Sequence, residues 1–240
     1  MKKHEQSVFT YENAKTVKGE SLGWVTAIRY LAPSDESGRW NVCPNAGHCA
    51  PVCLYTAGRG IFASMQAARI RKTVWRMTDK RGHFAAARAE IATASKRASL
   101  MGMKLAVRVN GTSDLPGDAV ALANDFPGIV FYDYTKVVSH ARAFADGRLP
   151  PNLHVTLSYD SATVPWNVAE PLLSRGVNVA VAFAVRKGEP LPEYWRGVPV
   201  IDGDAHDLRF LDRRGVVVGL RAKGAAKTAA GRRFVQAVES

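Results

Sequence analysis

LAVRVNGTSDLP, residues 105–116, combines the two features that decide the fold. It begins with a short, mostly apolar run, Leu105 to Val109, which predicts a strand that is buried on both faces. Polar residues follow directly, at the point where this strand would end. In parallel α/β proteins, functional side chains gather at the carboxyl ends of the strands. This one stretch therefore predicts both a kind of sheet and the edge of it that carries the chemistry.

The same pattern recurs along the chain, and we count about seven such strands. They are predicted at residues 24–31, 105–109, 129–132, 153–157, 177–183, 198–201 and 216–220. Apolar residues at steps of three and four predict helices over 63–77 and 84–101, with further connectors at 117–125 and 166–174. Strands that alternate with helices predict a parallel α/β sheet, in the form of a complete or partial (β/α) barrel of the TIM kind. An open, doubly wound sheet is the alternative.

We expect a single domain over residues 1–240, with an N-terminal extension at 1–20 and a basic C-terminal tail at 222–240. The tail reads as a loosely docked helix. The chain has no apolar run of the roughly 20 residues that a membrane-spanning helix needs, and its first residues do not resemble a signal peptide. These features predict a cytoplasmic protein without a membrane partner.

Polar residues after the predicted strands, together with Arg59 in the glycine-rich turn of residues 53–60, form the candidate site. As catalytic residues we predict Asp133, Lys136, Asp202 and Lys223. As residues that bind a cofactor we predict Arg59, Asn110, Thr112, Ser113, Asp114 and Ser158. The alternative is that the aspartates and serines only cap the helices that follow the strands. The opposite strand ends carry plain turn signals such as Phe126-Pro127-Gly128, and this asymmetry favours the functional interpretation.

The three cysteines of the chain, Cys43, Cys49 and Cys53, lie in one loop after the first predicted strand, NVCPNAGHCAPVCLYTAGRG (residues 41–60). An odd number of clustered thiols in a reducing compartment is more typical of metal ligands than of disulfides. We expect a [4Fe–4S] cluster whose fourth iron is left open for a small molecule. A zinc site that uses the same cysteines is the alternative, as are ordinary reduced cysteines.

This layout resembles the radical S-adenosylmethionine (radical SAM) superfamily. Its members are whole or partial β/α barrels with three cluster-binding cysteines in the loop after the first strand. The resemblance implies that Cys43, Cys49 and Cys53 hold the cluster and that S-adenosylmethionine is a cofactor. Two features depart from the usual pattern. The loop reads CxxxxxCxxxC instead of CxxxCxxC, and residues 110–114 stand where the family has a GGE segment.

A second resemblance is to a family of bacteriophage-encoded proteins. It rests on the strings CLYTAGRG, RVNGTSD, FYDYTK, NVAVAF, VIDGD, DLRFLD and VVGL-AKG at residues 53–60, 108–114, 131–136, 178–183, 200–204, 207–212 and 217–224. The likeness covers nearly the whole chain. It implies a phage or prophage origin, and hence the host cytoplasm as the location, but it names no reaction.

The formal net charge of +12 favours an anionic partner. The main hypothesis is an iron–sulfur enzyme with radical SAM-type chemistry on a small anionic or nucleotide-like substrate. The alternative is a metal-stabilised phage protein that binds nucleic acid or a host factor. Its contact face would be the basic stripe Arg69, Lys72 and Arg76, with Trp75 beside it.

Overall fold

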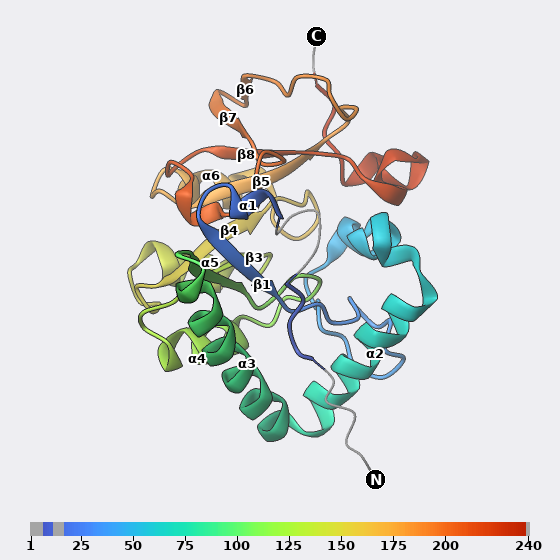
Figure 1. Ribbon diagram of the computed structural model, residues 1–240. Coiled ribbons are helices and arrows are strands. Elements are labelled where there is room, and N and C mark those ends of the chain that lie inside the picture. Colours follow the sequence, from blue (N-terminus) through green and yellow to red (C-terminus); the bar gives the residue numbers. More distant parts are fainter. Residues whose placement is uncertain (1–6, 12–16, 239–240) are drawn as a thin grey trace.

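The computed structural model describes residues 7–11 and 17–238 and has a mixed α/β fold (Figure 1). Its centre is an eight-stranded sheet in the order β1-β2-β3-β4-β5-β8-β7-β6. All neighbouring strands are parallel except β6 and β7. The strands are β1 (Trp24–Ile28), β2 (Lys104–Arg108), β3 (Val130–Thr135), β4 (Leu153–Ser158), β5 (Asn178–Phe183), β6 (Tyr194–Trp195), β7 (Val198–Asp202) and β8 (Val217–Arg221). All seven predicted strands are confirmed, and only the two-residue β6 was missed.

The α-helices lie mostly between successive strands. They are α1 (Val17–Glu20), α2 (Ala63–Thr78), α3 (Lys80–Leu100), α4 (Pro116–Asp125), α5 (Val138–Ala145) and α6 (Trp166–Leu173). Short 3-10 helices are η1 (Gly47–Val52), η2 (Leu54–Thr56), η3 (Gly58–Ile61), η4 (Arg209–Leu211), η5 (Gly224–Lys227) and η6 (Ala229–Arg233). The two long predicted helices are confirmed as α2 and α3.

From β1 to β5, each strand joins the sheet on the same side of the one before it. Because parallel crossovers are right-handed, this order places the connecting helices on one face of the sheet. The main apolar core lies on that face, where Ile91 of α3 and Leu122 of α4 belong to the same buried cluster as Val107 and Leu157 of the strands. Ala106 and Tyr132 belong to a separate, smaller cluster.

The sheet does not close, so the prediction of a complete barrel is wrong. The reason lies in the last three strands. β8 pairs with β5, which leaves β7 and β6 outside it. β6 then runs antiparallel to β7 and ends the sheet at the edge opposite β1.

Both edges of the sheet are partly covered by other segments of the chain. At one edge, the backbone of Thr10 forms an antiparallel bridge to Ile28 of β1, with N–O distances of 2.8 and 3.0 Å. At the other edge, β6 and β7 form a hairpin whose turn has Arg196 at φ 53° and Gly197 at φ 77°. Positive φ at both central residues is the geometry of the tight turns that suit the twist of a hairpin.

The C-terminal tail is more firmly placed than its sequence predicted. It forms η5 and η6, which pack against η1 of the cysteine loop, and Figure 1 shows these segments side by side. Beyond them, the backbone N–H of Gln236 donates to the carbonyl of Ala182 at 2.8 Å, and Ala184 N–H donates to Gln236 at 2.8 Å. The tail therefore forms one wall of the region around the cysteines.

Candidate functional site

A cavity of about 210 Å³ lies where the strands β2 to β5 and β8 end, beneath the cysteine loop and the C-terminal tail. Cys43, Cys49 and Cys53 all line it. Seven other residues of the predicted site line it as well: Asn110, Thr112, Ser113, Asp114, Lys136, Ser158 and Lys223. The expectation that the cysteine loop and the polar strand ends share one pocket is therefore confirmed.

Three residues of the predicted site lie outside this lining: Arg59, Asp133 and Asp202. Arg59 is exposed on η3. Asp133 lies beneath Asn110, where its carboxylate accepts the backbone N–H of Asn110 at 2.8 Å and the side-chain amide at 2.9 Å. The position of Asp133 is therefore that of a support for the end of β2 and not of a group in contact with a ligand.

Burial raises the pKa of Asp133 to about 7, although the hydrogen bonds from Asn110 and the charge of Arg108 oppose the shift. The folded pKa is above the unfolded one, so the folded state binds more protons between the two values. The stability that this group contributes is present at low pH and is lost as the pH rises toward 7.

We expect the free energy of unfolding of the wild type, relative to Asp133→Asn, to fall by up to about 1.4 kcal/mol per pH unit between pH 4.5 and 6.5. The asparagine side chain does not titrate, so it removes this one contribution. Urea unfolding of both proteins at several pH values in this window measures the difference. Parallel pH dependences would contradict the assignment.

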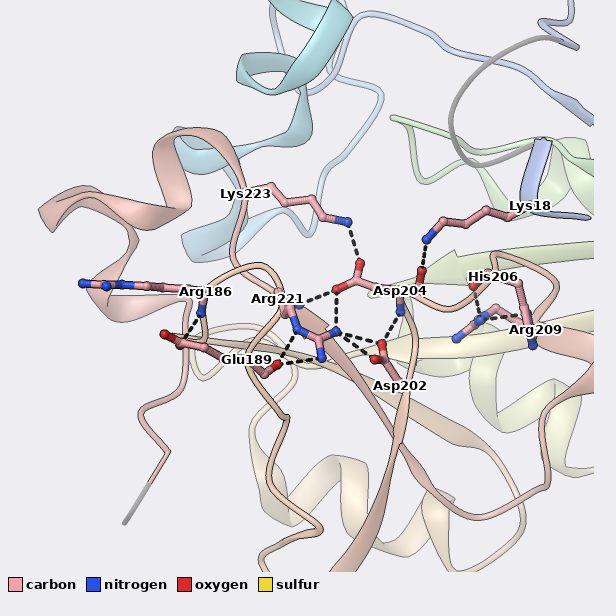
Figure 2. A network of polar contacts seen from close by, with 9 residues as sticks. All are labelled: Lys18, Arg186, Glu189, Asp202, Asp204, His206, Arg209, Arg221 and Lys223. Carbon is pink, nitrogen blue, oxygen red and sulfur yellow. Dashed lines mark hydrogen bonds and ion pairs between the residues drawn. The ribbon is translucent and has the colours of Figure 1, made fainter.

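Asp202 and Lys223, both predicted to be catalytic, belong to an ion-pair network at the rim of the site (Figure 2). Arg221 Nη1 lies 2.9 Å from both carboxylate oxygens of Asp202, and Lys223 Nζ donates to Asp204 at 2.5 Å. Arg221 also donates to the carbonyl of Glu189. Through these pairings, Asp202 and Lys223 help to hold β7, β8 and the loop that precedes β6 together, which is a structural role.

The three cysteines are half-buried. Burial raises the pKa of Cys43 to about 12 and that of Cys53 to about 11, and it also raises the pKa of Cys49. Each of these shifts is therefore opposite to what a free reactive thiolate requires. Mutual repulsion contributes to the shifts, because Cys43 and Cys53 each feel the charge that Cys49 would carry. Without a bound cation, the three side chains are neutral thiols.

Asp160, which follows β4, fixes the cysteine loop. Its carboxylate accepts the backbone N–H of Cys49 at 3.1 Å and that of Ala162 at 3.0 Å, and it lies 3.4 Å from Nδ1 of His48. Gly47 has φ +55°, and a Cβ there would lie 2.9 Å from Oδ1 of Asp160. Asp160 comes two residues after Ser158 in the sequence, but no local pattern indicates that it anchors this loop.

We expect Asp160→Asn to lower the free energy of unfolding by about 1–3 kcal/mol, because the amide nitrogen leaves one backbone N–H without an acceptor. Thermal or urea unfolding measures this loss. Asp146→Asn, which affects an exposed carboxylate between Arg148 and Arg175, is the control and should change the curve little. Equal effects of the two changes would contradict the anchoring role.

The basic stripe of α2 faces inward, which contradicts its predicted role as a nucleic-acid contact face. Arg69, Lys72 and Arg76 are each only 9% exposed, whereas Val74 is 37% exposed. Arg76 pairs with buried Asp118, which explains why the polar face of the helix turns toward the protein. The predicted helix is therefore confirmed, but its apolar side, which includes Val74, is not the side that packs against the rest of the protein.

Arg69 lies close to the cysteine loop. Its guanidinium stacks over the rings of Tyr30 and Tyr55 at 5.1 and 5.4 Å. Its Nε and Nη1 atoms are buried without a hydrogen-bond partner among the described residues. The charge of Arg69 lowers the pKa of Cys53, although burial has the larger and opposite effect. A second cation, Lys136, acts on Cys49 in the same way. Two buried cations therefore flank the three thiols.

Within the described part of the chain, no group of three or more His, Cys, Asp or Glu side chains is arranged to hold a single metal ion. A tetrahedral zinc site would need its sulfurs about 3.8 Å apart, given Zn–S bonds of about 2.3 Å. The thiols are nevertheless near enough to raise one another's pKa. Metal binding by the cysteines thus stays a prediction.

Among the described helices, none has the length and apolar character needed to cross a membrane. The fold and the cavity together define an α/β protein whose three cysteines face the C-terminal edge of an open, mostly parallel sheet. The profile of the Gene product 88 family matches residues 6–237, so the chain belongs to that family. This assignment fits the resemblance to bacteriophage-encoded proteins. No curated protein and no solved structure matches the chain.

Proposed function

We propose that this protein is an iron–sulfur enzyme in which Cys43, Cys49 and Cys53 hold a [4Fe–4S] cluster with one iron open to a small anionic ligand. The observation that carries the proposal is the meeting of all three thiols with the strand ends at one cavity. Thiolates are the ligands that such clusters use, and three of them leave one iron without a protein ligand.

The charges around the thiols support thiolate ligation. Arg69 and Lys136 are both at least nine-tenths buried, and both act electrostatically on the cysteines. Buried cations are costly unless negative charge lies nearby. Neutral thiols do not supply that charge, whereas thiolates bound to iron do. When bound, the cluster would supply an electron or a Lewis-acidic iron next to the cavity.

The finer proposal is a partial barrel of the radical SAM kind that uses S-adenosylmethionine. The consecutive parallel order of β1 to β5 supports it, because a partial barrel needs that order. Ser113 also supports it. Its Oγ donates to Asn110 Oδ1 at 2.8 Å, so toward a ligand it acts as an acceptor, as the amine of an amino acid requires.

The test is an anaerobic preparation with iron, sulfide and zinc analysis and an absorption spectrum. We expect about four irons and four sulfides per chain. Stoichiometric zinc without iron would overturn the proposal. For the finer proposal, the reduced protein with S-adenosylmethionine should yield 5′-deoxyadenosine and methionine, and no binding of that cofactor would exclude it.

A further inference from the structure

One wall of the cavity is formed by residues that have no part in the proposed cluster site. Ala180 and Ala182 of β5, Leu220 of β8 and Phe234 of the C-terminal tail make this wall apolar. Lys136 and Ser158, which follow or end β3 and β4, supply polar groups beside it. A cavity that combines an apolar wall with a few convergent polar groups is typical of a site for a small organic molecule.

Lys136 is the charged residue of this wall that forms no ion pair among the described residues. This residue is only 7% exposed. Its Nζ donates to Ser158 Oγ at 2.7 Å and lies 5.2 Å from the centre of the Phe234 ring. Among the described residues, no carboxylate lies within ion-pair distance of Nζ. The cavity carboxylate, Asp114, accepts instead from Thr135 and from the backbone N–H of Lys136, both at 2.7 Å.

The other cations of the cavity are already paired. Arg108 lies 3.0 Å from Asp207, Arg221 lies 2.9 Å from Asp202, and Lys223 donates to Asp204. Arg108 also has a buried Nε atom without a partner in the described chain, although it lines the same cavity. A buried ammonium whose direct contacts are a hydroxyl and a ring is costly, and an anionic ligand group would add counter-charge to that of the more distant Asp114 and cysteines.

We propose that Lys136 and Ser158 bind the carboxylate or phosphate head of the substrate, while Phe234 and Leu220 hold an aromatic or aliphatic body. Cys49 lines the same cavity as Lys136, so the head lies on the side of the cysteines. The inference deepens the proposed function, since it assigns the substrate class of the same cavity. Binding of the anion itself does not require the cluster, so the two claims fail separately.

The experiment measures the thermal stability of the anaerobic protein with five probes: phenyl phosphate, inorganic phosphate, benzoate, acetate and the neutral benzyl alcohol. A ligand that binds only the folded state raises the melting temperature in a concentration-dependent way. We expect an aromatic anion to stabilise the protein at lower concentration than the matching small anion, and benzyl alcohol to have no effect. The comparison of phenyl phosphate with benzoate shows which head group the site prefers.

Variants assign the contacts. Lys136→Met, close in shape and without charge, should weaken binding of the preferred aromatic anion by at least about 10-fold, because a hydrogen bond to a charged group is lost. Ser158→Ala, which keeps the lysine, should weaken it by several-fold. Phe234→Leu should remove the advantage of aromatic over small anions. Lys227→Met is the control, because this lysine is exposed on η5, and it should bind like the wild type.

A wild-type response to benzyl alcohol equal to that for the preferred aromatic anion would overturn the inference. An unchanged response of Lys136→Met or Ser158→Ala would do the same. Iron and sulfide in the preparation without any anion response would reject the inference and leave the proposed function standing. An anion response lost in Lys136→Met, from a protein that holds no iron, would support the inference and reject the proposed function.

Discussion

Replacing any one of Cys43, Cys49 or Cys53 with alanine should reduce the iron content of the anaerobic protein from about four atoms to less than about one per chain. Each change removes one of the three proposed ligands, which line the same cavity. The chain has no further cysteine to substitute for the lost thiolate. Iron and sulfide analysis and the visible absorption of the cluster measure the effect.

The variants should nevertheless stay folded. Burial raises the pKa of Cys43 to about 12 and that of Cys53 to about 11, so the metal-free protein buries neutral thiols, which behave as small apolar side chains. Circular dichroism and unfolding curves check this point. Leu54→Ala is the matched control, because Leu54 adjoins Cys53 and is 42% exposed, and it should retain its iron. A cysteine variant with full iron content would refute the assignment of that ligand.

Asp118→Ala should lower the free energy of unfolding by about 3–5 kcal/mol. Asp118 is 3% exposed and lies 2.8 Å from Nη1 of Arg29 and 2.8 Å from Nε of Arg76. Burial alone would raise the pKa of Asp118, but the hydrogen bonds and charges of the two arginines outweigh it and lower the pKa. Without this carboxylate, two buried guanidinium groups lose their counter-charge.

The same helix offers a control. Asp125 on α4 also pairs with an arginine, Arg88, at 2.8 Å. Here, however, the side chains are 34% and 46% exposed, respectively. Asp125→Ala should therefore cost only about 0–1 kcal/mol. Urea unfolding of both variants at neutral pH tests the contrast. A similar small loss for both would mean that Arg29 and Arg76 find other partners.

Much of the sheet could be predicted from the sequence because its signal is local. Short apolar runs such as 177–183 are buried on both faces, and this burial requires no knowledge of distant residues. The order of the last three strands could not be predicted in this way. β8 inserts between β5 and β7 and pairs with both. Such pairing depends on register and on the length of connections, which local periodicity does not report.

Burial of the basic stripe on α2 could not be predicted for a related reason. Arg76 is buried because Asp118, far away in the sequence, meets it in the fold. The gathering of the site was predictable in outline, because parallel strands end at one edge. The ligand-facing roles of individual residues were not, because Asp202 and Asp133 have partners that only the fold brings near. Phe234 was missed because nothing in the tail indicated that it would reach the cavity.

The partly covered edges of the sheet affect how readily two copies of the chain could associate. An exposed, regular edge strand offers a row of unpaired N–H and C=O groups on which a second chain can add. Here the bridge to Thr10 covers part of the β1 edge, and β6 covers the first part of the β7 edge, where Val200 N–H also donates to the carbonyl of Glu193 at 2.9 Å. Strand addition by another copy therefore finds only part of each edge open, which disfavours aggregation through this sheet.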